Sequence, residues 1–182
     1  AEAYGGTRAN ILRLAIPPRV AKVEKEQRLV APFHRAGGIV QRLGQPAGSA
    51  FERLAGSYDA GIRDLRSALH GTAFASFIVD PLPGMRRAAS ALAWMAAESL
   101  MAGRAAVVVL PDARETDAMM RELEALGLRR FAGNGSQTGG WTGDVAVLTA
   151  ALPPADRYRA WLAIATGTVQ CVIGTRAAMY AP

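Results

Sequence analysis

The 182-residue sequence has few of the residues that support disulfide, metal or covalent chemistry. It contains one cysteine, Cys171, and two widely separated histidines, His34 and His70. A single cysteine excludes an internal disulfide and a zinc site, so a reducing, cytoplasmic compartment is expected. Because Cys171 lies in an apolar run, we expect it to be a small core residue. Neither histidine has an acidic or cysteine companion nearby in the sequence, so both are expected to be ordinary surface or turn residues.

Long apolar runs and lysine are also scarce. No stretch approaches the roughly eighteen uninterrupted apolar residues of a membrane-spanning helix, so no span is expected. Of the 21 basic residues only Lys22 and Lys25 are lysine. The net charge of +6 and the pI near 10.2 favour an acidic partner such as nucleic acid, and arginine binds phosphate in a bidentate manner. A chain rich in alanine, arginine and glycine also follows from a GC-rich genome, so the charge alone leaves both interpretations open.

Residues 1–72 give a weak structural signal. Residues 1–20 read as a short helical segment that ends at Pro17 and Pro18. Residues 21–72 read as a linker, because a mixed charge run and several glycines and a proline interrupt them. Short helices are expected there around Ile39–Leu43, Ala50–Leu54 and Ala60–Ala68.

Residues 73–182 are regular, because compact apolar strands alternate with helices. The expected strands are Phe74–Val79, Ala105–Leu110, Val145–Leu148 and Val169–Ile173. The expected helices between them are Met85–Met101, a helix from Asp112 or Thr116 to Leu126, and Pro153–Ala165. This alternation predicts an α/β fold with a parallel sheet and flanking helices.

Ligands of such sheets bind beyond the carboxyl ends of the strands. At the first strand end a phosphate loop would need several glycines followed by Lys and Ser/Thr. Here only Gly84 remains, with Arg86 and Arg87 in the place of the lysine and hydroxyl. The arginines could pair with an anion at the helix N-terminus, or the segment could be a rigid Pro-Gly turn with solvated arginines.

The last strand end carries the sequence Gly174-Thr175-Arg176. A buried strand followed by such a turn presents a hydroxyl and a guanidinium, as many nucleic-acid motors do toward a phosphate backbone. A capped surface turn with one arginine is the alternative interpretation. No strand end offers a nucleophile with a base, paired carboxylates or metal-ligand spacing, so no catalytic or metal residue is predicted.

These segments together resemble the primosomal protein N′ family, the PriA replication-restart DNA helicases, in the diverged form found in actinobacteria. The resemblance rests on the closing stretch from Gly174 to Pro182, on residues 156–161 before it, on the strand ending in Pro111 and Asp112, and on residues 3–19. It implies that residues 1–20 end an amino-terminal DNA-binding domain. It also implies that residues 73–182 are a partial RecA-like helicase lobe 1 of the P-loop NTPase type.

Carried over residue by residue, the resemblance implies that Gly174, Thr175 and Arg176 contact the DNA backbone, with Pro111 and Asp112 close by. The degenerate nucleotide-binding residues would be Gly84, Arg86 and Arg87. The implied partners are single-stranded or branched DNA, single-strand binding protein and other primosome components. Zinc is expected only in the family's carboxyl-terminal part.

The sequence departs from the family pattern at the nucleotide loop, which argues against ATP and magnesium binding. The expected function is therefore a helicase-like replication-restart protein that binds stalled or branched forks without its own ATPase. Two alternatives stay open. One is an ATP-dependent 3′–5′ DNA helicase active at full length, and the other is a protein-docking domain without DNA contact.

Overall fold

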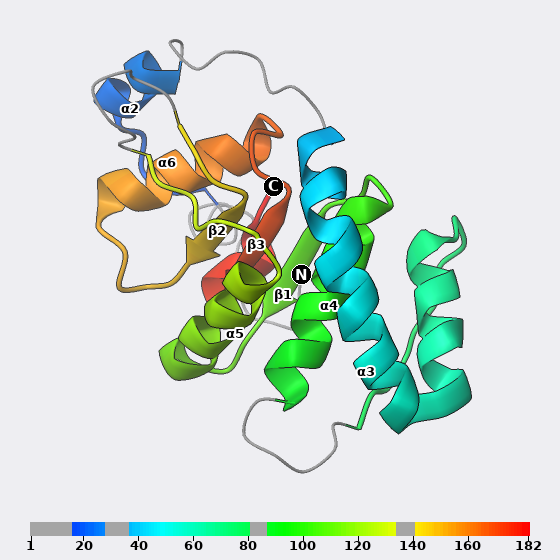
Figure 1. Cartoon of the computed structure of the whole chain (residues 1–182). Helices are drawn as coiled ribbons and strands as arrows, with labels where there is room; N and C mark the ends of the chain where they lie inside the picture. Colours follow the sequence, from blue (N-terminus) through cyan, green and yellow to red (C-terminus); the bar gives the residue numbers. More distant parts are fainter. Residues whose placement is uncertain (1–15, 28–36, 81–86, 134–140) are drawn as a thin grey trace.

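The computed structural model describes residues 16–27, 37–80, 87–133 and 141–182 (Figure 1). Its sheet consists of β1 (Ala106–Val109), β2 (Val145–Leu148) and β3 (Cys171–Gly174). The strands are parallel and lie in the order β1-β3-β2, so the last strand is the central one. Three of the four expected strands and the α/β class are thereby confirmed.

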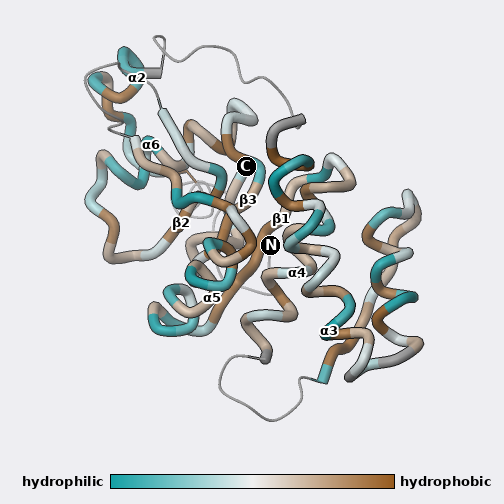
Figure 2. The backbone as a smooth tube through the Cα atoms, in the orientation of Figure 1, coloured by the Kyte–Doolittle hydropathy of each residue, from teal (hydrophilic) through white to brown (hydrophobic). Residues whose placement is uncertain are grey.

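Helices cover both faces of this sheet. Helix α4 (Arg87–Met101) precedes β1, α5 (Ala113–Ala125) joins β1 to β2, and α6 (Pro154–Ala165) joins β2 to β3. Because alternate side chains of a strand point to opposite faces, Cys171 and Ile173 pack in the core with α4 and α5, whereas Val172 packs in the core with α6. Figure 2 shows hydrophobic strands in the middle of the fold, whereas α5 and parts of α3 carry hydrophilic stretches. The cover is incomplete at β1, where Val107 and Val109 are 54% and 46% exposed.

The expected strand Phe74–Val79 is wrong. Among the described residues this segment has no regular secondary structure and pairs with no strand. Phe74 and Ile78 are 95% and 101% exposed, and Val79 packs against the core only in part. A β-prone run becomes a strand only when a neighbour completes its hydrogen-bond ladder, and β1 is paired with β3 alone in the described part of the chain.

The expectation of short separate helices after residue 37 is also wrong. One helix, α3, runs from Gly37 to His70 and includes Pro46. Its buried residues recur at helical spacing and pack against α4: Ile39, Leu43, Ala47, Ala50, Ile62 and Leu65. Burial of this stripe outweighs the unfavourable helix propensity of the glycines and the proline.

A buried carboxylate joins α3 to α4. Glu98 is fully buried, and its Oε1 accepts a hydrogen bond of 3.1 Å from Nε1 of Trp94. Nε2 of His70 lies 2.6 Å from the other oxygen, and Nε of Arg66 lies 3.2 Å from Oε1. His70 is exposed at the end of α3, as expected of a surface residue, but it has an acidic partner 28 positions away that the sequence did not indicate. His34 lies outside the described residues.

Two short elements complete the described fold. Helix α2 (Ala21–Gln27) packs on α6 with Val23 fully buried, although the sequence reads there as a charged linker. The 3₁₀-helix η2 (Arg176–Tyr180) follows β3 directly. No helix in the described ranges is long and apolar enough to cross a membrane.

Gly174 allows the central strand to approach β2 closely. A Cβ atom at this position would lie 1.9 Å from the carbonyl oxygen of Leu148 and 2.8 Å from its carbonyl carbon. Both neighbours are backbone atoms of the paired strand, so they cannot move without disturbing the ladder.

We expect Gly174→Ala to lower the free energy of unfolding by about 1–3 kcal/mol, as overpacking of a core does. Gly61→Ala in α3 is the matched control, because nothing lies within 4 Å of a Cβ there. That change should be neutral or stabilise by up to about 1 kcal/mol, since alanine favours a helix over glycine. Urea denaturation measures both, and equal midpoints for the two variants would contradict the close approach.

Candidate nucleic-acid interface

The carboxyl ends of the three strands meet at one edge of the sheet. The amide of Leu110, after β1, donates to the carbonyl of Gly174 over 2.7 Å. The amide of Thr175, after β3, donates to the carbonyl of Leu148 over 3.2 Å. The structure therefore brings together the segment with Pro111 and Asp112 and the segment with Gly174, Thr175 and Arg176, as the strand order requires.

The central strand ends in two side chains that are available to a ligand. Thr175 is half-buried at the N-cap of η2, but its side chain makes no capping hydrogen bond. Arg176 is exposed, and no ion pair joins it to another described residue. Gly174 itself is buried. Consecutive residues thus supply a hydroxyl and a guanidinium at the middle of the edge.

Asp112 positions a helix at the same edge. Its Oδ1 accepts a hydrogen bond of 2.9 Å from the amide of Glu115 and so caps the N-terminus of α5. The hydroxyl of Thr116 donates to the carbonyl of Asp112 over 2.8 Å. Of the two alternative starts expected for this helix, Asp112 and Thr116, the structure has Asp112 as the N-cap. Pro111 before it and Arg114 in the first turn are exposed.

Arg157, by contrast, is engaged inside the protein. Its Nη2 donates to the carbonyls of Ala150 and Leu152, over 2.8 and 3.2 Å, and thereby holds the loop between β2 and α6. It is therefore not free to bind a ligand with that nitrogen, unlike Arg114 and Arg176.

Most of the predicted nucleotide-binding residues lie outside the described part of the chain. Gly84 and Arg86 lie outside the described residues, and Arg87 is described only as the first residue of α4. Within the ranges that the structure covers, no group of three or more His, Cys, Asp or Glu side chains could hold a metal ion. Cys171 is fully buried, and burial raises the pKa of its thiol to about 12, so it is an inert core residue as expected.

Charged side chains join α2 to α6. Glu24 accepts hydrogen bonds from Arg19, at 2.6 and 2.7 Å, and from the hydroxyl of Tyr158, at 2.7 Å. Glu26 pairs with Arg159, whose side chain is only 7% exposed, at 2.8 Å. The hydrogen bond from Arg159 lowers the pKa of Glu26 below its ordinary value, while burial followed by the bond to Glu24 raises the pKa of Tyr158.

The Glu26–Arg159 pair predicts a pH-dependent stability. Since the folded-state pKa of Glu26 lies below its ordinary value of 4.5, its contribution is present above that value and is lost as the pH falls through the lowered pKa. We expect Glu26→Gln to cost about 1–3 kcal/mol at neutral pH, the range for a hydrogen bond between charged groups. The difference from the parent protein should shrink in acid.

Thermal or urea unfolding at several pH values measures this effect. Lys25→Gln, an exposed change on the same helix, should stay within about 0.5 kcal/mol of the parent. A deficit of Glu26→Gln that persists unchanged in acid would contradict the assignment.

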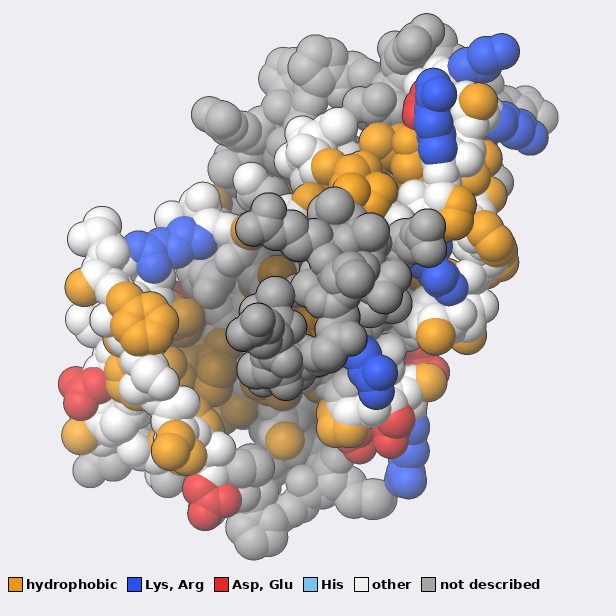
Figure 3. Space-filling model, turned by 180° about the vertical axis from the view of Figure 1, so that it is seen from behind, with side chains coloured by type: hydrophobic (Ala, Val, Ile, Leu, Met, Phe, Trp, Pro, Cys, Tyr) orange, Lys and Arg blue, Asp and Glu red, His pale blue; other side chains and the backbone are white. Residues whose placement is uncertain are grey.

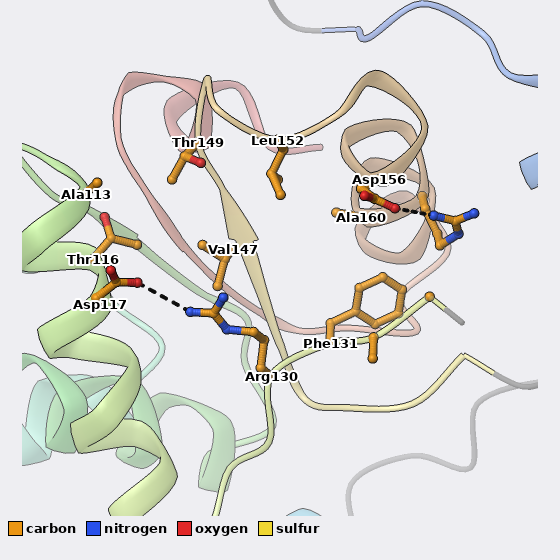
Figure 4. Close-up of a pocket in the computed structure, with 13 residues that line it drawn as sticks. Ala113, Thr116, Asp117, Arg130, Phe131, Val147, Thr149, Leu152, Asp156 and Ala160 are labelled. Carbon is orange, nitrogen blue, oxygen red and sulfur yellow. Dashed lines mark hydrogen bonds and ion pairs between the residues drawn. The ribbon is translucent and has the colours of Figure 1, made fainter. Parts of the chain in front are cut away.

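A cavity of about 520 Å³ lies at the outer edge of β2 (Figure 4). Residues of α5, of α6 and of the segment 130–133 surround it, and Val147 of β2 lies at its centre in the view. Arg130 points across it toward Asp117 on α5, and Asp156 comes from α6 on the opposite side. The sequence did not reveal this cavity, because its walls come from four segments that share no local motif.

The fold and the edge define the class of protein. It is an α/β protein with a parallel sheet. In folds of this class, ligands bind to the loops at the carboxyl edge of the sheet. Comparison with known proteins then identifies the relatives. The chain is homologous, over 98% of its length, to the mycobacterial proteins named probable replication restart protein PriA.

The identity is 33% to the protein of Mycobacterium leprae (strain TN) and 35% to that of Mycobacterium tuberculosis (strain ATCC 25618 / H37Rv). The chain spans about a quarter of these relatives, 24% and 23% of their respective lengths. No protein-family model matches the chain, and no solved structure matches it. The predicted resemblance to the PriA family is confirmed by these relatives.

Proposed function

We propose that this chain is a DNA-binding part of a helicase-like replication-restart protein and that it does not hydrolyse ATP. The proposal rests on two consecutive residues at the end of the central strand. Arg176 is exposed, and the hydroxyl of Thr175 makes no capping hydrogen bond. The similarity to replication restart proteins supports DNA as the source of the phosphate. Single-stranded or branched DNA is the proposed partner, within a larger primosome assembly that includes single-strand binding protein.

The chemistry of the edge suits a phosphate backbone. A guanidinium and a hydroxyl donate hydrogen bonds to phosphate oxygens, and charged hydrogen bonds of this kind are the stronger ones. The exposed Arg114 lies in the first turn of α5 at the same edge, beside the carboxylates of Asp112 and Glu115, and its guanidinium is the group there that would pair with a second phosphate. Because the carboxylate of Asp112 caps the N-terminus of α5, its role in this proposal is to position that helix.

The chain's basic residues support binding over a larger surface. Figure 3 shows that most of the Lys and Arg side chains visible on the rear face lie along one side of the molecule. Arg19, Lys22 and Lys25, at and beside α2, are exposed. With a net charge of +6, the chain has the electrostatic character of a nucleic-acid binder.

The test is a fluorescence-anisotropy titration of the 182-residue chain with forked DNA at several salt concentrations. Arg176→Ala should weaken binding and reduce the slope of log affinity against log salt by roughly 0.7–0.9, which is the effect of one lost phosphate contact. Arg121→Ala is the matched control, because it removes an exposed arginine further along α5. A loss for Arg121→Ala equal to that for Arg176→Ala would contradict the proposed site.

The absence of ATPase activity is tested separately. The segment from Asp80 to Ala88 has one glycine and no Lys-Ser/Thr pair, so it lacks the donors that hold nucleotide phosphates. We expect a chain of the relatives' full length to show no ATP binding by equilibrium dialysis. Nucleotide binding that protects Arg86 or Arg87 from arginine-specific modification would instead support the alternative of an ATP-dependent 3′–5′ helicase.

A further inference from the structure

Only the first half of the outer edge of β2 is hydrogen-bonded to another segment of the chain that the structure describes. Val145 turns both of its main-chain groups outward: its amide donates to the carbonyl of Arg129 over 3.0 Å, and its carbonyl accepts from the amide of Phe131 over 2.7 Å. Arg130 forms a parallel bridge with Val145. The segment then leaves the edge, because Ala132 pairs with Thr142 in the antiparallel sense. The first half of the edge is therefore paired with the segment around Arg130.

The second half of the edge opens into the cavity. Main-chain groups of successive strand residues point alternately to the two sides. The carbonyl of Leu148 accepts from Thr175 on the β3 side, so Val147, like Val145, directs its amide and carbonyl outward. Val147 lines the cavity, and outside the β2–β3 pairing no backbone hydrogen bond joins it to another described residue.

We propose that this cavity, the β2-edge cleft, binds an extended peptide segment of a partner protein, which adds as a strand beside Val147 and carries a basic side chain. Strand addition at a sheet edge takes its affinity from main-chain hydrogen bonds and its specificity from alternate side chains. The volume of about 520 Å³ suits a short segment, and Phe131, Leu152 and Ala160 offer apolar contacts to it.

The charges at the cleft select the chemistry of the partner. The side chains of Asp117 and Asp156 are 61% and 50% exposed. Arg130 is 51% exposed and meets Asp117 only at 3.5 Å, whereas Arg159 is 7% exposed and pairs with both Glu26 and Asp156. Three carboxylates, those of Glu26, Asp117 and Asp156, thus share two guanidiniums, and this surplus of negative charge makes the cleft favour a cation over a phosphate backbone.

Two capped probe peptides test the proposal. The first alternates valine and lysine, and its twin carries N-methyl groups on alternate residues, which removes the main-chain donors and keeps the charge. By isothermal titration of the 182-residue chain, the twin should bind at least about tenfold more weakly, the effect of losing one buried hydrogen bond. By NMR, the first peptide should shift the amide signals of Val147 and Thr149. Equal affinity of the two peptides, or shifts elsewhere on the protein, would overturn the proposal.

Two variants separate the main chain from the side chain. Val147→Pro removes the outward amide and leaves the pairing of β2 with β3 intact, so it should abolish peptide binding. Val147→Ala keeps that amide and should bind within about threefold of the parent, because it loses only part of one apolar contact. Should Val147→Pro fail to fold, the N-methylated twin still decides the question.

The charge assignment has its own control. Asp117→Asn should weaken the valine–lysine peptide several-fold and leave a valine–threonine peptide unaffected. A single-stranded oligonucleotide that shifts the same amides and displaces the peptide would overturn the choice of a peptide and assign the cleft to nucleic acid. This proposal is independent of the carboxyl-edge site, since Arg176→Ala should leave peptide binding unchanged.

Discussion

The structure depends on the close contact between the central strand and its neighbour at Gly174. β3 is buried along its whole length and is hydrogen-bonded on both sides, to β1 and to β2. At its last residue the backbone of Leu148 occupies the space that a side chain would need. Because this contact fixes where β3 ends, it also fixes where Thr175 and Arg176 emerge. The position of the proposed DNA contact is therefore a consequence of sheet packing.

The sequence predicts the three paired strands and the helices between them, because these are short apolar runs alternating with helical spacing. It fails at Phe74–Val79, which is also a short and largely apolar run. The missing information is the hydrogen-bonding neighbour, and that is a property of the whole sheet. The sequence also fails at α3, where Gly44, Pro46 and Gly48 suggest an interrupted linker. There the burial of one face against α4 decides the conformation.

The side-chain clusters show the same limit for the site. His70 and Glu98 are separated by 28 positions, and Glu26 and Arg159 by 133. No local pattern marks such pairs, so the tight packing of α3 on α4 and of α2 on α6 could be found only in three dimensions. The residues of the carboxyl edge were predictable, because the carboxyl ends of parallel strands meet at one edge of the sheet whatever the sequences of the loops are.

The carboxyl edge of the sheet and the outer edge of β2 differ in chemistry. We therefore expect the two surfaces to bind different kinds of partner. At the carboxyl edge Arg114 and Arg176 are exposed, and Asp112 is engaged in its cap. At the outer edge Asp117 is accessible, and Glu26 and Asp156 share the single guanidinium of Arg159, so carboxylates outnumber guanidiniums. The two proposed sites therefore suit different partners, a polyanion at the carboxyl edge and a basic peptide at the outer edge.

The central claim is that DNA contacts the carboxyl edge of the sheet. Amide chemical-shift mapping of the chain with a short single-stranded oligonucleotide tests it most directly. The account predicts that the largest shifts fall on Thr175, Arg176 and the first turn of α5, and that Val147 is unaffected. Shifts confined to α2 or to the β2-edge cleft would contradict it.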